Sequence, residues 1–371
     1  MSKVIVYYGP REAFETYIRD IEDYKNFIDL IYIHDSYKSE LFKINLNSGE
    51  IEKEIKISVK NVVAFSDEYS LISEGATNAF SSLLNSFLFE CLILQNPPLY
   101  IFKQLEKKYG EIKPIYYEYT KFDSSKLKEI DQLYDQKIIG QKMAKTKLMR
   151  TILSNTELSL NHKPTVIMFY GPSGVGKTET AKMLSEILGQ ELFREQFSMF
   201  QSNEFGAFLF GDVHYKNSFA KELLERKSNI ILLDEFDKCP SNVYSAFYQL
   251  FDEGIFMDKN YKVYLKDTII ICTSNFLSVD DIKKNVGDPI FYRFDATIEF
   301  KSLNIEETKE IIKMRYRKYV STLTEEQRKI LNNIEAEEKL LTLAKYFKNF
   351  RDIDIYIKDF ISGVLLPTYL K

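Results

Sequence analysis

The sequence predicts an α/β protein in which a small α/β domain precedes a larger α/β region with a purely helical end. Short, continuous apolar runs over 166–170, 230–233 and 269–272 are typical of central strands in a parallel sheet covered on both faces. Helical patterns alternate with these runs, and after residue 300 the pattern is helical alone. A length of 371 residues is also enough for two or three domains.

Residues 1–120 are expected to form the small α/β domain, with a role in recognising a partner or client. A strand is predicted over 4–8 and a helix from 12 to about 30. Further strands are predicted over 31–33, 41–46 and 55–59, the last two joined as a hairpin by the turn at 47–49. Helices are predicted over 77–94 and 99–109, and a last strand over 115–119. The polar stretch 121–133 is interpreted as a linker.

The larger region is expected to divide into an α/β body over 134–300 and a helical lid over 301–371. The lid's helices are predicted over 305–320, 325–333, 335–347 and 353–365.

Charge and cysteine content exclude several classes of protein. With 50 basic and 54 acidic residues the net charge is −4, which gives no case for binding nucleic acid or membrane over the whole surface. Three scattered cysteines favour a reducing compartment over a disulfide framework. The longest apolar stretch, 80–94, is interrupted by polar residues and is too short to cross a bilayer. We therefore expect a cytoplasmic protein.

The strongest local signal is a glycine-rich loop over 171–178. It follows the strand predicted over 166–170 and opens a helix predicted over 179–188, as a phosphate-binding P-loop requires. Glycines let successive backbone N–H groups point into one concavity, and the helix N-terminus adds partial positive charge. Lys177 is expected to reach the β- and γ-phosphates of a nucleotide, and the hydroxyl of Thr178 to hold Mg²⁺. The nucleotide-binding residues predicted here are Gly171, Pro172, Ser173, Gly174, Val175, Gly176, Lys177, Thr178 and Glu179.

Two carboxylates end the apolar strand predicted over 230–233. Asp234 is expected to support Mg²⁺, and Glu235 to polarise the water that attacks the γ-phosphate. An apolar strand that ends in two acids is common by itself. Its position downstream of the glycine-rich loop makes the pair more specific.

Together these motifs resemble the AAA+ ATPases, and within them the Clp-type unfoldases and disaggregases, over about residues 134–360. The resemblance implies a three-layer α/β/α P-loop NTPase module with a helical lid, which uses ATP and Mg²⁺. By the same resemblance Ile138 and Ile139 contact adenine and Asn275 orients the attacking water. Arg293 would reach the ATP of a neighbouring subunit, and Arg351 would act as a sensor on the lid. Arginine suits both positions because its planar, always-charged fork spreads over phosphoryl oxygens.

Two departures from the Clp-type pattern leave the function open. The loop that grips a threaded polypeptide in that family is shorter here and lacks its second glycine. His214 and Tyr215 are the candidate client contacts in it, but a simple surface turn is an equal alternative. The tripeptide with which such proteins dock a peptidase is absent from the sequence.

The leading hypothesis is a ring-forming, hexameric ATPase that remodels protein clients selected by the N-terminal domain. The alternative is a nucleotide-controlled scaffold that docks an effector, as in stress or phage-defence systems. A nucleic-acid-dependent motor is less favoured, because the basic clusters at 142–150 and 313–318 are short and fall on predicted helices.

Overall fold

The computed structural model describes residues 2–48, 56–158, 162–199, 202–212, 217–347 and 349–370. They form two compact units, and neither unit is one continuous segment of the chain. Unit 1 contains residues 1–119, 200–227 and 254–265, and unit 2 contains the remainder. Two segments that lie between the expected nucleotide-binding motifs in sequence therefore belong to the unit of the N-terminal domain. Among the described residues, no helix combines the length and the apolar character needed to cross a membrane.

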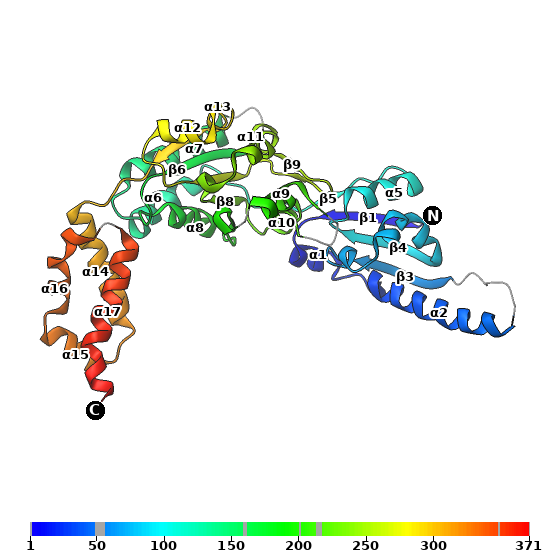
Figure 1. Ribbon diagram of the computed structural model, residues 1–371, viewed down its shortest axis with the longest axis horizontal. Helices are drawn as coiled ribbons and strands as arrows, with labels where there is room; N and C mark the ends of the chain where they lie inside the picture. Colours follow the sequence, from blue (N-terminus) through cyan, green and yellow to red (C-terminus); the bar gives the residue numbers. More distant parts are fainter. Residues whose placement is uncertain are drawn as a thin grey trace. The chain divides into compact units, whose positions relative to one another are not determined.

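Unit 1 is built on a five-stranded parallel sheet with the order β2-β3-β4-β1-β5. The side chains that pack on one another at its centre include Tyr7, Phe14, Val63, Phe65 and Ile93. Figure 1 draws β1, β3 and β4 side by side. In the N-terminal segment, the helices and strands of unit 1 are β1 (Lys3–Tyr8), α1 (Arg11–Ile18), β2 (Tyr24–Asn26), α2 (Phe27–Ser48), β3 (Ile57–Ala64), α3 (Glu74–Asn78), α4 (Phe80–Leu83), β4 (Phe87–Gln95), α5 (Leu99–Tyr109) and β5 (Ile115–Tyr116).

Two later segments complete unit 1. They contribute α9 (Ser202–Phe210), α10 (Phe219–Glu225), and the antiparallel pair β9 (Ile255–Met257) and β10 (Lys262–Tyr264). The ring of Phe219 packs edge-on against Phe256 at 4.9 Å, which joins α10 to β9.

Several predicted elements of the N-terminal domain are wrong. The helix expected from 12 to 30 is interrupted, because Asp23 adopts a positive φ of 52° and β2 follows it. The strands expected over 31–33 and 41–46, with their hairpin turn, are replaced by α2 up to Ser48, and residues 49–55 lie outside the described residues. In α2, Phe27, Leu30 and Ile31 are buried at the spacing of one helix face.

The helix expected over 77–94 is also wrong. It consists of the short helices α3 and α4 followed by the strand β4. An uninterrupted apolar run fits a buried helix and a buried strand equally by pattern. Here β4 lies between β1 and β3 in the sheet, and Leu92, Ile93 and Leu94 are all buried because both faces are covered. The strand expected over 4–8 and the helix expected over 99–109 are confirmed as β1 and α5.

The body of unit 2 is a second parallel sheet, with the order β12-β6-β11-β8-β7. One face packs on α6, α7 and α8 through a single apolar cluster. The other face, which includes Met168, Leu233 and Cys272, is fully buried too, so the sheet is the middle of three layers. The elements are α6 (Lys126–Lys137), α7 (Lys142–Glu157), β6 (Thr165–Tyr170), α8 (Lys177–Ile187), β7 (Phe193–Gln196), β8 (Ile230–Asp234), α11 (Tyr248–Glu253), β11 (Ile269–Thr273), α12 (Val279–Val286), α13 (Asp288–Phe291) and β12 (Ala296–Glu299).

The C-terminal part of unit 2 is helical, as the sequence predicts. It contains α14 (Ile305–Ser321), α15 (Glu325–Asn333), α16 (Ala336–Thr342) and α17 (Phe350–Tyr369). These helices pack around a core of their own that includes Ile312, Leu331, Leu340 and Ile357, and Figure 1 draws α14–α17 together. The α/β body with a helical lid is thus confirmed. Residues 126–133 of the stretch interpreted as a linker lie in α6.

Candidate nucleotide-binding site

The glycine-rich loop joins β6 to α8 at the carboxyl edge of the unit 2 sheet. Gly171 has a φ of +129°, and a Cβ at this position would lie 2.0 Å from the carbonyl oxygen of Phe300. Gly176 has a φ of +108°, and its Cβ would lie 3.0 Å from Ile138. The loop therefore needs glycine at these two positions. Residues 173–178 line a cavity of about 740 Å³.

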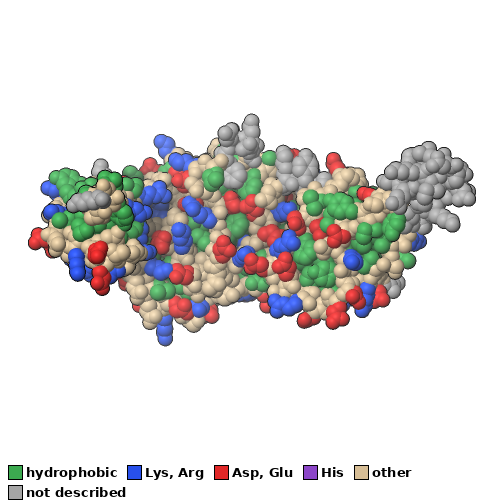
Figure 2. Space-filling view, turned by 90° about the horizontal axis from the view of Figure 1, so that it is seen from below, with side chains coloured by type: hydrophobic (Ala, Val, Ile, Leu, Met, Phe, Trp, Pro, Cys, Tyr) green, Lys and Arg blue, Asp and Glu red, His purple; other side chains and the backbone are tan. Residues whose placement is uncertain are grey.

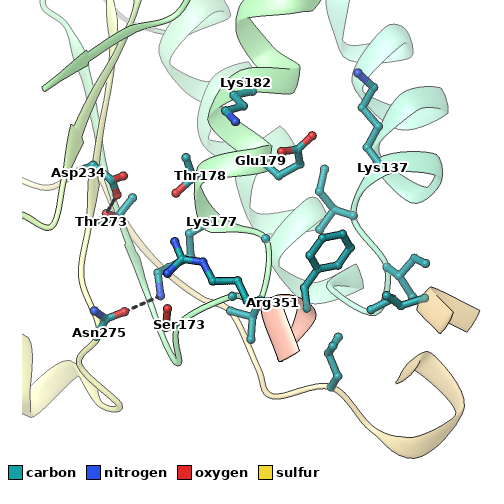
Figure 3. A pocket seen from close by; sticks show the side chains of 18 of the residues that line it. Lys137, Ser173, Lys177, Thr178, Glu179, Lys182, Asp234, Thr273, Asn275 and Arg351 are labelled. Atoms are coloured by element: carbon teal, nitrogen blue, oxygen red, sulfur yellow. Dashed lines mark hydrogen bonds between the residues drawn. The ribbon is translucent and has the colours of Figure 1, made fainter. Parts of the chain in front are cut away.

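Lys177 is the first residue of α8, and its side chain is nearly fully buried. Its ammonium donates to the carbonyl oxygens of Gly171 (2.5 Å) and Pro172 (2.7 Å) and to Asn275 Oδ1 (3.2 Å). Burial lowers the pKa of Lys177 to about 8, and the carboxylates of Asp237 and Asp234 oppose that shift. Figure 3 shows the Lys177–Asn275 hydrogen bond, which links the P-loop to the residue after β11.

Asp234 ends β8, and both of its oxygens are engaged. Oδ1 accepts a hydrogen bond from the Thr273 hydroxyl at 2.5 Å. Oδ2 accepts two hydrogen bonds from Arg194, from Nη2 at 2.6 Å and from Nε at 3.0 Å. The carboxylate is therefore fixed between the neighbouring strands β11 and β7, at the edge where Thr178 also lies.

Glu235 is held in a backbone conformation that is rare for a residue with a side chain. Its φ and ψ are 55° and 44°, in the left-handed region. Its N–H donates to Thr273 Oγ1 at 2.9 Å, and its Oε2 accepts from Gln196 Nε2 at 3.2 Å. Strain of this kind persists only where the surroundings fix it, and it is concentrated at functional sites. The result is a carboxylate turned into the cavity beside Asp234.

Apolar residues line a different part of the cavity. Ile138 and Ile139, which follow α6, face the cavity together with Leu303, Ile311 and Met314 of the lid region. A cavity that combines apolar walls with a few fixed polar groups is typical of a site for a small ligand. Here the polar part suits phosphates and the apolar part suits a flat base.

The lid is attached to the P-loop by its last helix. Asn349 caps α17 by accepting a hydrogen bond from Asp352 N at 3.0 Å, and Phe350 N donates to Gly174 O at 3.0 Å. Arg351, in the first turn of α17, lines the cavity and extends into it on the side of Lys177 (Figure 3). Asn349 thus acts as the N-cap of the helix that carries Arg351.

Arg293 is not among the residues that line this cavity. Its Nε lies 2.8 Å from Asp252 Oδ2, Nη1 donates to Pro289 O at 2.5 Å, and its guanidinium lies 4.4 Å from the centre of the Tyr248 ring. Residues packed on several sides fix the guanidinium away from the nucleotide cavity of its own chain. His214 and Tyr215 lie outside the described residues.

Comparison with known proteins agrees with this geometry. Residues 162–326 match the AAA domain (Cdc48 subfamily). By that match, this part of the chain is an AAA domain. Among its relatives, the ATP-dependent Clp protease ATP-binding subunit ClpE of Bacillus subtilis is 28% identical over 283 residues, which is 66% of this chain and 40% of that protein.

Two chaperone proteins ClpB are similarly related. The protein of Chlamydia muridarum is 33% identical over 165 residues, 41% of this chain and 19% of the relative. The protein of Prochlorococcus marinus is 31% identical over 253 residues, 60% of this chain and 29% of the relative. The match therefore spans well under half the length of these relatives.

Four residues that were not predicted for the nucleotide site also line the cavity. Lys182, Arg194, Arg315 and Lys318 line the cavity, and all four are basic. Lys182 follows Thr178 by one helical turn, so the spacing could have predicted it. Arg194 reaches the site because β7 pairs with β8, with Gln196 opposite Asp234. The pairing of β7 with β8 cannot be predicted from a sequence pattern within either strand.

Proposed function

We propose that this protein binds and hydrolyses ATP at the cavity between the P-loop, the ends of β8 and β11, and the lid. One arrangement carries the proposal: Lys177, Asp234, Glu235 and Asn275 come from separate segments of the chain and meet around one cavity. Such an arrangement at the carboxyl edge of a parallel sheet suits phosphoryl transfer, which needs positioning and charge more than covalent chemistry.

The ammonium of Lys177 is positioned for the phosphates. It is nearly fully buried and donates to two backbone carbonyls and Asn275, all of which are neutral acceptors. The anionic oxygens of a phosphate would bind this positive charge more strongly and could replace them. The backbone N–H groups of the P-loop and the start of α8 add to this attraction. Glu235 is the proposed base for the attacking water, and Asn275 its second contact.

The residues present also fit Mg²⁺. The hydroxyl of Thr178 and the carboxylate of Asp234 are oxygen ligands of the kind that Mg²⁺ prefers, and both face the cavity. A bound ion would supply positive charge to neutralise the phosphate oxygens during transfer.

Exchange of Glu235 for Gln tests the hydrolytic assignment. The amide keeps the size of the side chain and can still meet Gln196, but it cannot accept a proton from water. We expect ATP to bind as in the wild type while phosphate release falls by about 100-fold or more. Normal turnover in E235Q would contradict the role of Glu235.

We further propose that the protein assembles as a ring, hexameric by its likeness to the family, in which Arg293 completes the site of a neighbouring subunit. The packing of Arg293 away from its own cavity supports this. The sharp test is to mix two inactive variants, Arg293→Ala and Glu235→Gln. In a mixed ring, a subunit with intact Glu235 can receive Arg293 from its E235Q neighbour, so activity should return.

Each variant alone provides the control for that mixture. If the mixture stays as inactive as its components while the two proteins are shown to co-assemble, Arg293 does not act across the interface. An R293A ring that hydrolyses ATP normally contradicts the proposal as well.

The work that hydrolysis drives is proposed to be remodelling of protein clients, because the relatives' names describe chaperones and a protease subunit. ATPase rates with an unfolded protein, with single-stranded DNA, with double-stranded DNA and with no addition test this. Stimulation by unfolded protein that is lost in Tyr215→Ala would support threading of a polypeptide. Figure 2 shows acidic and basic side chains interspersed over the described part of the face that it draws, which does not favour a nucleic-acid motor. Strong stimulation of the ATPase rate by DNA would favour a nucleic-acid motor over remodelling of protein clients.

A further inference from the structure

The sheet of the N-terminal domain has a topological switch point between β1 and β4. The connection after β1 leads to β2 at one edge of the sheet, whereas the connection after β4 leads past β1 to β5 at the opposite edge. Ligands of open parallel sheets bind in the crevice that such a reversal creates outside the carboxyl ends of the strands. The residues at this position are Gly9 to Arg11 after β1, and Gln95 and Asn96 at the end of β4.

These residues converge on a single carboxylate, that of Glu225 at the end of α10. Asn96 Nδ2 donates to it at 2.7 Å, and Gln95 Nε2 donates to its two oxygens at 3.2 and 3.3 Å. The N–H of Arg11, the first residue of α1, donates at 3.0 Å. The positive end of a helix thus adds to two amide donors.

The two amides are a built part of the domain. Gln95 and Asn96 are both 0% exposed. Gly9 N donates to Asn96 Oδ1 at 2.9 Å, which orients the amide so that its Nδ2 faces Glu225. Asn96 also has a positive φ of 45°, a conformation that asparagine tolerates better than most residues. Both amide N–H donors also reach the carbonyl oxygen of Gly9, at 2.9 Å from Asn96 Nδ2 and 3.1 Å from Gln95 Nε2, so they keep an acceptor when the carboxylate leaves.

The residues after Glu225 make contacts of their own with the N-terminal domain. The buried guanidinium of Arg226 stacks on the Tyr119 ring at 3.9 Å, and the Tyr119 hydroxyl donates to Arg226 O at 3.1 Å. Lys227 Nζ lies 2.5 Å from Glu12 Oε1. Residues 226–229 then lead directly into β8, which ends at Asp234.

We propose that Arg11, Gln95 and Asn96 form a carboxylate-binding site of the N-terminal domain, in which Gly9 orients the amide of Asn96. Glu225 is the built-in ligand of this site, and an acidic segment of a partner protein takes the site by displacing Glu225. The site shares no residue with the nucleotide cavity, so it can be tested without ATP and independently of hydrolysis.

The first experiment uses the full chain with Glu225→Ala and measures amide hydrogen exchange. Loss of the carboxylate should raise exchange at the start of α1 and along α10 by about tenfold or more, whereas β4 stays protected because the sheet is intact. Glu222→Ala is the matched control, since Glu222 lies on the same helix and its carboxylate accepts from Asn217 at 2.6 Å. Unchanged exchange in E225A would overturn the proposal.

The second experiment asks whether the vacated site takes a free carboxylate. Sodium acetate should restore protection at the start of α1 in E225A, and sodium chloride at equal ionic strength should not. A hexaglutamate peptide should bind E225A about tenfold more tightly than the wild type, because Glu225 no longer competes. Equal effects of acetate and chloride, or equal binding of the peptide, would each contradict the site.

A third variant tests whether the amide is the recognition group. Asn96→Asp in the E225A background keeps the size of the side chain and can keep the positive φ, but it replaces the donor with a negative charge. Acetate rescue and peptide binding should both be lost. Retention of either would show that Asn96 does not recognise the carboxylate.

Discussion

Arg194 and Asp234 form an ion pair at the carboxyl edge of the unit 2 sheet, with Nη2 and Nε of the arginine both directed at Oδ2 of the aspartate. The pair joins β7 to β8 and uses an oxygen that a metal ion would also use. The aspartate side chain is 8% exposed and the arginine side chain 40%, so solvent weakens the attraction without removing it. A metal that takes Oδ2 must therefore displace Arg194 or share the oxygen with it.

This competition leads to the first prediction. Arg194→Ala should strengthen binding of Mn²⁺, as a probe for Mg²⁺, by roughly fivefold in the presence of ADP, corresponding to about 1 kcal/mol for a partly exposed pair. Electron paramagnetic resonance of free Mn²⁺ measures it directly. Lys182→Ala is the matched control, because it also removes a positive charge from the cavity lining. Equal affinities in R194A and wild type would show that Arg194 does not compete.

The same pair shows where sequence reasoning ends. Each local part of the site was predictable: a glycine-rich loop between a strand and a helix, and an apolar strand that ends in two acids. Arg194 was not, because only the pairing of β7 with β8 places it beside Asp234. Strand order depends on long-range packing, and no pattern within a few residues contains it.

In the N-terminal domain, the apolar pattern of a fully buried segment does not distinguish a helix from a strand. The run that forms β4 reads equally as helix or strand, and its place between β1 and β3 decides the outcome. The sequence also did not predict that α10 belongs to unit 1. Its docking depends on Gln95, Asn96 and Glu225, which are far apart in the chain and carry no recognisable motif.

The second prediction concerns Gly171. Gly171→Ala should lower the free energy of unfolding by about 3 kcal/mol and abolish nucleotide binding, because the new Cβ meets a backbone oxygen at a strained φ. Urea unfolding and binding of a fluorescent ATP analogue measure the two effects. Gly189→Ala is the matched control: its φ is also positive, +66°, but the Cβ would meet nothing within 4 Å. It should cost about 1 kcal/mol. Comparable losses in both variants would mean that backbone conformation alone, rather than contact with Phe300, is responsible.

The third prediction separates two arginines that line the same cavity. Arg315 is bound within the lid: its Nη2 lies 2.7 Å from Asp354 Oδ1, and its guanidinium lies 4.5 Å from the centre of the Phe350 ring. Arg315→Ala should therefore lower the free energy of unfolding by about 1–2 kcal/mol. Arg351 extends into the cavity instead (Figure 3). Arg351→Ala should leave stability unchanged and reduce phosphate release by roughly 10- to 100-fold. A destabilised R351A with normal hydrolysis would reverse the two assignments.

The last prediction uses pH to test burial in the N-terminal domain. Glu68 is 5% exposed, and burial raises its pKa from 4.5 to about 7, although the N–H of Ile28 donates to its Oε2 at 3.3 Å. Between pH 4.5 and 7 the folded chain thus keeps a proton that the unfolded chain has released. The free energy of unfolding must then fall as the pH rises through this interval, because the folded state alone has to give up that proton or bury a charge.

Glu68→Gln removes this dependence, because the amide stays neutral and can still accept from Ile28. The stability of E68Q relative to wild type should increase by about 1–2 kcal/mol between pH 5 and pH 8, allowing for partial solvent screening. Urea unfolding of both proteins at the two pH values measures the difference, and titrations common to both cancel. Glu74→Gln is the matched control, because it removes an exposed carboxylate from the same domain. A difference between E68Q and wild type that does not change with pH would show that Glu68 is ionised in the folded protein throughout this range.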